Sequence, residues 1–325
     1  MPRIAPKALQ ISAGARHEFA GVVAEVGQGI EDVTIGDHVV VQPFMLEGNC
    51  PWCRTDHPSL CDAAAVVGFT YPGGGGIADF ISVPRYNVHK LPTTIPLEVG
   101  ALVEPLAVGW NAVSSSRFRP GNTALIIGAG PIGLAVILAL SAKGAARILV
   151  SEPSAARAET ARSLADIHVL DHASPSLAVD VRQLGGGQGP DIVFDCAGVQ
   201  KGIDFAFDAV RKQGTIVNVA SWASKPVVNV NALSLKQLTY IGVEAYTRQH
   251  FEEVIAKIAS GDIKDPARLI TSTITLQMAP KKIQQLLETT LLVTPVPKTV
   301  GSLRTSQQHK SAAMRSSVLF IAEAE

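Results

Sequence analysis

The sequence predicts an α/β fold in which a doubly wound parallel sheet is joined to a second domain rich in β-strands. A glycine-rich turn, GAGPIG, lies between an apolar run at 124–127 and a long apolar helix. Further strand-like runs lie at 192–196 and 215–219, and each follows a helical stretch. Helices in these positions are the crossover connections that a parallel sheet requires. Before the turn, segments 19–43 and 76–91 alternate short valine-rich runs with glycine turns, the pattern of antiparallel strands.

The glycine-rich turn predicts a dinucleotide site. Gly128, Gly130 and Gly133 have the spacing G-x-G-x-x-G, with Pro131 and Ile132 completing the turn. The first glycine permits a tight turn, the second lets the backbone approach a pyrophosphate, and the third lets helix pack on strand. The pyrophosphate is expected at the helix N-terminus, where unpaired N–H groups and the helix dipole favour an anion.

An acidic residue after the next strand favours NAD as the dinucleotide. The strand is predicted at 148–150, and Glu152 follows it, nineteen residues beyond Gly133. A carboxylate there suits the ribose hydroxyls of NAD and repels the 2′-phosphate of NADP. Arg157 is close enough in sequence to leave NADP open as the alternative.

A membrane helix is the competing interpretation of residues 125–140, which are almost wholly apolar. The three glycines, Pro131 and the flanking strand signals argue against a spanning helix. We therefore expect no membrane partner.

Composition indicates a two-domain protein that acts on a small molecule. The chain has 325 residues, and its 28 basic and 28 acidic side chains balance, which excludes nucleic acid and anionic membrane surfaces as expected partners. Three of the four cysteines are crowded between 50 and 61, unlike a disulfide framework. We expect a reducing compartment, the cytoplasm; mitochondrial targeting is a weaker alternative, because residues 1–17 carry three basic side chains and no acid.

The crowded cysteines predict a closed, structural zinc site. Cys50 and Cys53 form a C-x-x-C turn and Cys61 follows after seven residues, a spacing that brings three thiolates to one tetrahedral ion. Candidates for the fourth ligand are Glu47, three residues before the first cysteine, and, as alternatives, Asp56 and His57. A set of unrelated buried thiols is the competing interpretation, and a redox pair is disfavoured because no βα pattern surrounds it.

A second group of ligand types lies outside the cysteines. His17 and Glu18 precede a predicted strand, and Glu104 lies in an otherwise apolar helix start, where burying a carboxylate without a partner is costly. One histidine with one or two carboxylates makes an incomplete catalytic zinc site, which ordinarily has three protein ligands and an open position. A solvated His-Glu turn is the alternative.

Together these motifs resemble the zinc-containing medium-chain dehydrogenase/reductases, most closely their butanediol and sorbitol (polyol) dehydrogenase branch. The resemblance runs from about His17 to about Leu287. The matching segments are HEFAGVVAEVGQGI, GDHVVVQP, GNCPWC with Cys61, GFTYPGGGGIADFISVP, ALVEPLAVGWNAV, GAGPIG, SEPSAAR, DCAGVQ and GTIVNVA.

The resemblance implies a GroES-like β domain followed by a Rossmann domain, and NAD(P)-linked oxidation of a secondary alcohol. In that chemistry zinc polarises the substrate oxygen and hydride passes to the nicotinamide. His17 is similar to the family's histidine ligand, Glu18 to its acidic neighbour and Glu104 to the glutamate of the polyol branch. The three cysteines and Glu47 stand where the family has its structural zinc ligands. The family also implies a homodimer or homotetramer with an alcohol or polyol substrate.

Two departures from the family pattern lead to further expectations. The family's catalytic cysteine lies about thirty residues before its histidine, whereas only sixteen residues precede His17 here and Arg16 replaces a glycine. We expect an N-terminally truncated β domain and weak or absent catalysis. A non-catalytic NAD-binding protein with a structural zinc is the alternative, and a zinc-independent quinone-type reductase is disfavoured because that group usually lacks the cysteine lobe.

The expected organisation follows from these segments. It comprises an incomplete GroES-like domain at 1–112 with a zinc lobe at 47–61, a Rossmann domain at 113–247, a return to the first domain at 248–290, and a poorly ordered tail at 291–325.

Overall fold

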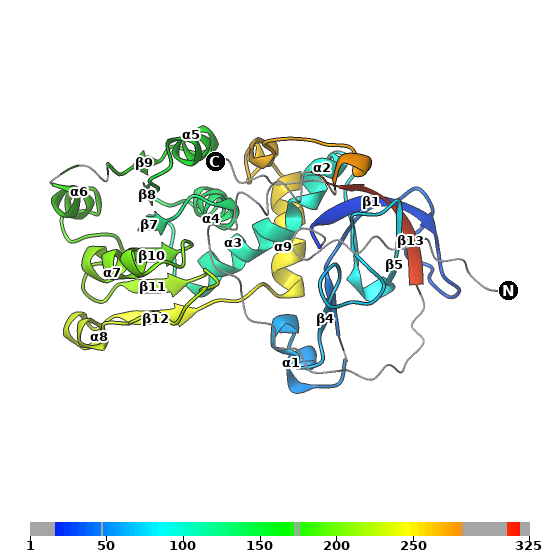
Figure 1. Cartoon of the computed structure of the whole chain (residues 1–325), viewed down its shortest axis with the longest axis horizontal. Helices are drawn as coiled ribbons and strands as arrows, with labels where there is room; N and C mark the ends of the chain where they lie inside the picture. Colours follow the sequence, from blue (N-terminus) through cyan, green and yellow to red (C-terminus); the bar gives the residue numbers. More distant parts are fainter. Residues whose placement is uncertain are drawn as a thin grey trace. The chain divides into compact units, whose positions relative to one another are not determined.

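The computed structural model describes residues 17–46, 48–171, 174, 176–279 and 281, and the backbone of 311–318 (Figure 1). These residues fall into two units. Unit 1 contains the described residues up to Leu102 and from Ser272 onward, and unit 2 runs from Val103 to Thr271.

Unit 2 is built on a six-stranded parallel sheet with the strand order β12-β11-β10-β7-β8-β9. The chain moves outward from β7 through β8 to β9, then returns to β10 on the other side of β7. This reversal makes the sheet doubly wound, which confirms the predicted fold class. In such sheets ligands bind at the carboxyl ends of the strands where the order reverses, here those of β7 and β10. The strands are β7 (Thr123–Ile127), β8 (Arg147–Ser151), β9 (His168–Val169), β10 (Ile192–Asp195), β11 (Thr215–Asn218) and β12 (Thr239–Gly242).

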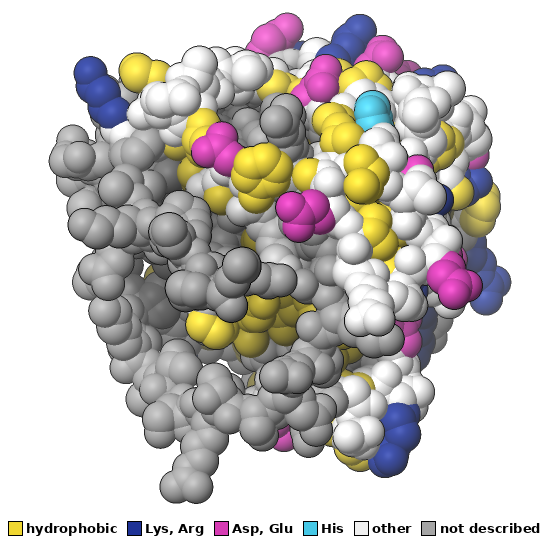
Figure 2. All heavy atoms as spheres, turned by 90° about the vertical axis from the view of Figure 1, so that its right-hand side faces the viewer, with side chains coloured by type: hydrophobic (Ala, Val, Ile, Leu, Met, Phe, Trp, Pro, Cys, Tyr) yellow, Lys and Arg dark blue, Asp and Glu magenta, His cyan; other side chains and the backbone are white. Residues whose placement is uncertain are grey.

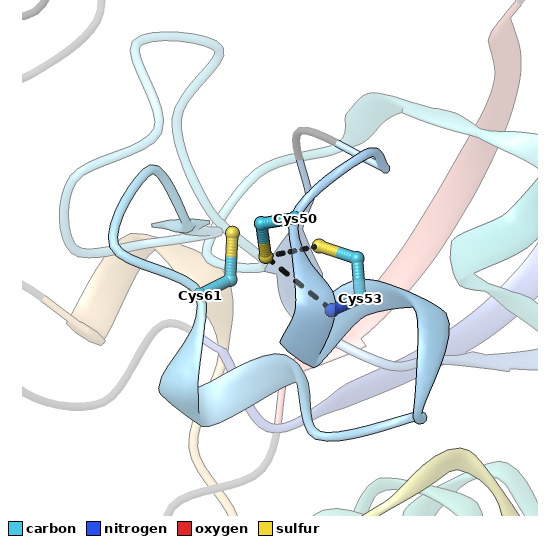
Figure 3. Close-up of side chains that lie close together, drawn as sticks. All are labelled: Cys50, Cys53 and Cys61. Atoms are coloured by element: carbon cyan, nitrogen blue, oxygen red, sulfur yellow. Dashed lines mark hydrogen bonds between the residues drawn. The ribbon is translucent and has the colours of Figure 1, made fainter.

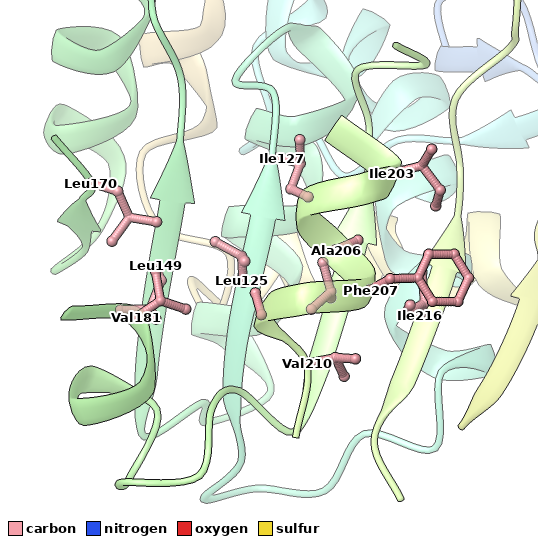
Figure 4. Close-up of a cluster of buried hydrophobic side chains, with 12 residues drawn as sticks. Leu125, Ile127, Leu149, Leu170, Val181, Ile203, Ala206, Phe207, Val210 and Ile216 are labelled. Carbon is pink, nitrogen blue, oxygen red and sulfur yellow. The ribbon is translucent and has the colours of Figure 1, made fainter. Parts of the chain in front are cut away.

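Helices cover both faces of this sheet. On one face α6, α7 and α8 pack over a core of strand residues such as Leu125, Leu149 and Ile216, as Figure 4 shows for α7. On the other face α4 packs against β7, β8, α3 and α5. The helices are α3 (Val103–Ser115), α4 (Pro131–Ala142), α5 (Ala155–Leu164), α6 (Leu177–Leu184), α7 (Gln200–Ala209), α8 (Val230–Lys236), α9 (Arg248–Ala259) and the 3₁₀ turn η3 (Pro266–Leu269).

The long apolar stretch around the glycine turn is divided between β7 and α4. Residues Gly133 to Leu140 of α4 are all buried, because the helix lies between the sheet and α3; a helix that is apolar all round belongs in such a place. No helix in the described part of the chain has the length and hydrophobicity needed to cross a bilayer.

Unit 1 contains an antiparallel sheet of order β5-β13-β1-β2-β6 and a two-stranded sheet of β3 and β4. Its core gathers Phe19, Val23, Val39 and Ile81 among other apolar side chains. The elements are β1 (Phe19–Glu25), β2 (His38–Val41), β3 (Phe44–Met45), α1 (Pro51–Arg54), η1 (Pro58–Leu60), β4 (Ala65–Val66), β5 (Phe80–Pro84), η2 (Arg85–Asn87), β6 (Val88–Lys90), α2 (Leu97–Ala101), η4 (Leu276–Met278) and β13 (Ser311–Val318).

The apolar stretch that contains Glu104 forms two helices, α2 and α3, that meet at Leu102. The break has a physical cause in Pro105, which lacks an N–H and whose ring obstructs the carbonyl four residues before it. Ending α2 at Ala101 and starting α3 at Val103 puts the proline in the first turn of a helix, where it is tolerated. The break also coincides with the passage from unit 1 to unit 2.

The tail after residue 290 was expected to be poorly ordered but contains a strand, β13. β13 pairs with β1 on one side and β5 on the other, with Gly21 opposite Ser316 and Ile81 opposite Met314. The segment SAAMRSSV has one β-branched residue, so its propensity for strand is low; the two flanking strands supply its backbone partners. The other residues of 291–325 lie outside the described part.

The observed limits of the units also differ from the expected domain limits. Unit 2 begins at Val103 and ends at Thr271, whereas the Rossmann domain was expected at 113–247. The reason is that α3 and α9 pack on each other and α3 on α4, so both helices belong with the parallel sheet.

On the side of the molecule in Figure 2, acidic and basic side chains of the described residues are interspersed without a large area of one sign.

Candidate functional site

The glycine-rich turn lies at the carboxyl end of β7, at the point where the strand order reverses. Gly128 has φ +90°, in the left-handed region that other residues avoid, and its N–H donates to the Ser151 carbonyl at 2.9 Å. Gly130 is the N-cap of α4 and Pro131 its first residue. A Cβ on Gly133 would collide with the Gly128 carbonyl oxygen, whereas one on Gly130 would meet no protein atom within 4 Å.

This geometry fits a pyrophosphate. The close packing of Gly133 holds the start of α4 against the turn, and the space above Gly130 is open to a ligand. N–H groups of the first turn of a helix have no partner within the helix, so they bind anions. The turn thus has the shape that the sequence motif predicted.

Glu152 is more deeply integrated into the turn than its sequence position indicated. Its side chain is 2 % exposed, and its carboxylate accepts hydrogen bonds from the N–H of Ala129 and of Ser154, both at 2.8 Å. Arg157 Nη2 lies 3.1 Å from Glu152 Oε1. The carboxylate therefore connects the glycine turn to the start of α5, with the guanidinium beside it.

Small residues follow β10, the strand beside β7. Ala197 and Gly198 come after β10, where the buried Asp195 carboxylate accepts from both of their N–H groups at 3.1 Å. Burial raises the pKa of Asp195. A Cβ on Gly128 would lie 3.1 Å from the Ala197 Cβ, so the loops after β7 and β10 are in close contact. The burial of Asp195 was not predicted from the sequence.

The three clustered cysteines come together in unit 1. Figure 3 shows Cys50 and Cys53 at the start of α1, with Cys61 approaching from the loop after η1. All three sulfur atoms lie within 4.8 Å of one another, and the Sγ atoms of Cys50 and Cys53 are 3.3 Å apart. Thiolates around a tetrahedral zinc lie roughly 3.8 Å apart, given Zn–S bonds of about 2.3 Å. The arrangement therefore fits a metal ion.

The local backbone favours a thiolate at Cys50. The Cys53 N–H donates to Cys50 Sγ at 3.4 Å, and this hydrogen bond lowers the pKa of Cys50. Desolvation raises the pKa of Cys53 to about 11. Without a metal, the negative charge is thus preferred on Cys50 of this pair.

The candidates for the fourth ligand have different outcomes. Glu47 lies outside the described residues, so its role stays a prediction. Within the described part of the chain, neither Asp56 nor His57 belongs to the group of atoms around the cysteine sulfurs. His57 is exposed, and its Nδ1 lies 2.7 Å from the Thr55 carbonyl oxygen.

The second group of candidate ligands is divided between the units. His17 and Glu18 immediately precede β1 in unit 1, and Glu104 lies near the start of unit 2. Burial lowers the pKa of His17 to about 4 and raises the pKa of Glu18, since desolvation disfavours either charged form. Neutral imidazole is the form that binds metals. One imidazole and two carboxylates are a donor set suited to zinc.

Glu104 has a partner that the sequence did not indicate. Its side chain lies in the first turn of α3, and the Tyr246 hydroxyl donates to Oε1 at 2.8 Å. The two residues are 142 positions apart, and the segment around Tyr246 contains no motif. Only the folded structure of unit 2 places them side by side.

A glycine-rich turn on a doubly wound sheet, together with two groups of candidate metal ligands, is typical of oxidoreductases that use a nicotinamide nucleotide and zinc. The sequence matches two family models, "Alcohol dehydrogenase GroES-like domain" at residues 6–93 and "Zinc-binding dehydrogenase" at residues 131–260. The chain belongs to this zinc-containing alcohol dehydrogenase family, in its butanediol and polyol dehydrogenase branch.

Individual relatives agree with this assignment. The chain is 36% identical to the (R,R)-butanediol dehydrogenase of Neisseria gonorrhoeae, over 73% of the chain and 67% of the relative. It is 35% identical to the enzyme of the same name from Saccharomyces cerevisiae, over 83% of the chain and 75% of the relative. The crystal structure of 2R,3R-butanediol dehydrogenase from Bacillus subtilis matches with a TM-score of 0.77 and 31% identity, covering 85% of this chain and 77% of that one.

Proposed function

We propose that this chain oxidises the secondary alcohol of a vicinal diol, with NAD as the hydride acceptor. The observation that carries the proposal is the buried carboxylate of Glu104 in unit 2, which accepts a hydrogen bond from the Tyr246 hydroxyl. His17 and Glu18 of unit 1 supply the other ligand types of a zinc site. The relatives named butanediol dehydrogenases support a small diol as substrate. A longer polyol is the neighbouring alternative within the same reaction class.

In this proposal each group of residues has one task. His17 and Glu104 hold zinc, with Glu18 beside them, and Cys50, Cys53 and Cys61 hold a second, structural zinc. A metal held by these residues would lower the pKa of the alcohol, and a nicotinamide held at the glycine turn would take up its hydride. The turn from Gly128 to Gly133, including Pro131 and Ile132, binds the pyrophosphate through its N–H groups.

The direct test is an NADH-formation assay on the purified full chain. We expect weak turnover with butane-2,3-diol, because the set of zinc ligands is incomplete, with still less turnover of sorbitol and none above background with ethanol. His17→Ala should remove the activity. The matched control is His168→Ala, an exposed histidine on β9, which should turn over like wild type. Absence of NADH formation with every diol and polyol, in a sample that contains zinc, would contradict the proposal.

The same assay decides between NAD and NADP. Glu152 supports NAD, because its buried carboxylate sits at the end of β8 beside the glycine turn and would repel a 2′-phosphate. Arg157 pairs with that carboxylate, which leaves its guanidinium less available to a phosphate. We expect kcat/KM to be higher with NAD than with NADP.

We further propose a homodimer that forms through the edge of the parallel sheet. β12 is one of the two edge strands of the sheet, and edges that stay unpaired invite association. The segment leading to it carries Val227, Val230 and Leu235, which are 74%, 65% and 81% exposed. Light scattering after size-exclusion chromatography is expected to give a dimer or a multiple of it, and Leu235→Arg a monomer. Val179→Arg, at a half-exposed valine of α6, is the control that should leave the mass unchanged.

The cysteines support a cytoplasmic location. All four are free thiols in the structure, and free thiols persist in reducing compartments.

A further inference from the structure

A buried phenol is directed at the carboxylate of Glu104. Tyr246 is 1% exposed and Glu104 is 6% exposed, and the Tyr246 hydroxyl donates to Glu104 Oε1 at 2.8 Å. Both residues belong to unit 2. A hydrogen bond from a hydroxyl to a carboxylate in such surroundings is among the stronger kinds in proteins.

The backbone that carries Tyr246 is fixed to the same helix as Glu104. Asn111 Nδ2, on α3, donates to the carbonyl oxygen of Ala245 at 2.9 Å. Ala245 has φ +48°, a left-handed conformation that is unfavourable for a residue with a Cβ. Such a conformation persists only where the surrounding contacts enforce it, so the position of Tyr246 is imposed by its neighbours.

A second set of contacts secures the tyrosine ring. The ring of Phe251, on α9, lies 5.4 Å from that of Tyr246, and Trp110 Nε1 on α3 donates to Glu253 Oε2 on α9 at 2.6 Å. The loop before the tyrosine is therefore bound to α3 through Ala245, and α9, which follows the tyrosine, is bound to α3 through Glu253. The phenol has little freedom to leave Glu104.

We propose that Tyr246 is a positioning residue for the catalytic zinc, acting through Glu104. Its hydroxyl fixes the rotation of the carboxylate, so that Glu104 is already oriented when the metal binds. Tyr246 itself contacts neither substrate nor cofactor in this proposal. The inference rests on the proposed function, because it takes Glu104 as a zinc ligand. Partners that orient metal ligands in this way typically contribute 10–100-fold to metal affinity.

The test is zinc affinity in Tyr246→Phe, which removes a single oxygen atom. Zinc is withdrawn from the full-length holoenzyme by a competing chelator, and the zinc of the cysteine lobe is identified by its absence in Cys53→Ser. We expect the remaining zinc to bind about 10–100-fold more weakly in Tyr246→Phe, with the lobe zinc unchanged. The Co²⁺-substituted enzyme should show an altered visible spectrum. The matched control is Tyr240→Phe, on β12, whose ring stacks on Phe207 and should leave both measurements unchanged.

A double-variant cycle separates positioning from mere structural support. If Tyr246 acts through Glu104, then adding Tyr246→Phe to Glu104→Ala should change zinc affinity no further. Asn111→Ala, which removes the hydrogen bond to Ala245, is a second variant and should weaken the same zinc to a smaller degree. A lowered melting temperature with zinc affinity and cobalt spectrum unchanged would overturn the proposal.

The outcome is distinguishable from failure of the proposed function. If wild type holds zinc only in the cysteine lobe, the assignment of His17 and Glu104 as ligands fails. If wild type holds both zincs and Tyr246→Phe holds them equally tightly, only the role of Tyr246 fails.

Discussion

Gly133→Ala is expected to abolish NADH binding and to destabilise unit 2. The new Cβ would collide with the Gly128 carbonyl oxygen and lie 3.5 Å from Ile126 Cγ2, so either the turn or the start of α4 must move. Overpacking of this kind costs about 1–3 kcal/mol. The N–H groups at the start of α4 would move with it, and the anion site would lose its geometry. NADH fluorescence titration and thermal unfolding measure the two effects.

Gly130→Ala separates cofactor binding from folding at the same turn. Its φ of −70° suits alanine, and the added Cβ would meet no protein atom within 4 Å, so stability should not change. The methyl group would, however, occupy the space that a pyrophosphate needs, and NADH should bind more weakly. Gly242→Ala, with equal room in β12, should bind NADH normally. An unchanged NADH affinity in Gly130→Ala would mean that the pyrophosphate lies elsewhere.

The features that the sequence predicted well are those whose residues lie close together in the chain. The glycine turn occupies six residues between a strand and a helix, and the structure places β7 and α4 on either side of it. The cysteine cluster spans twelve residues, from 50 to 61, and its sulfurs meet. In both cases the spacing alone restricts the geometry, because a short loop has few ways to bring its side chains together.

The features that it could not predict depend on contacts between distant segments. The bond between Tyr246 and Glu104, and that between Glu152 and the Ala129 N–H, arise only when helices and loops pack. β13 is a strand because two other strands flank it, in spite of its low intrinsic preference. Whether His17, Glu18, Glu104 and the cysteines bind metal stays a prediction, as do the cofactor contacts of Glu152 and Arg157.

Loss of the lobe zinc is expected to unfold the segment from Gly48 to Val66 while the parallel sheet of unit 2 stays intact. α1 has four residues and none of them is buried, and a helix of that length is not stable alone. Trp52 and Leu60 are 45% and 44% exposed, so hydrophobic burial contributes little in this lobe. Its order must come largely from the metal, as in small zinc domains whose binding free energy is their folding free energy.

Cys53→Ser is the variant that tests this dependence, because it removes one of three described ligands. Zinc content should fall from about two to about one per chain, and hydrogen exchange should accelerate in the lobe but not in β7 or β10. Cys196→Ser replaces a cysteine in unit 2, outside the lobe group, and should leave the zinc content unchanged. Equal zinc in Cys53→Ser and wild type would favour the interpretation of unrelated thiols, and a disulfide between Cys50 and Cys53 in the native enzyme would favour a redox pair. The expected result, zinc loss from the lobe with NADH binding retained, would identify the cysteines as a purely structural site. NADH binding should be retained because the cofactor turn lies in unit 2 and does not depend on the lobe for its shape.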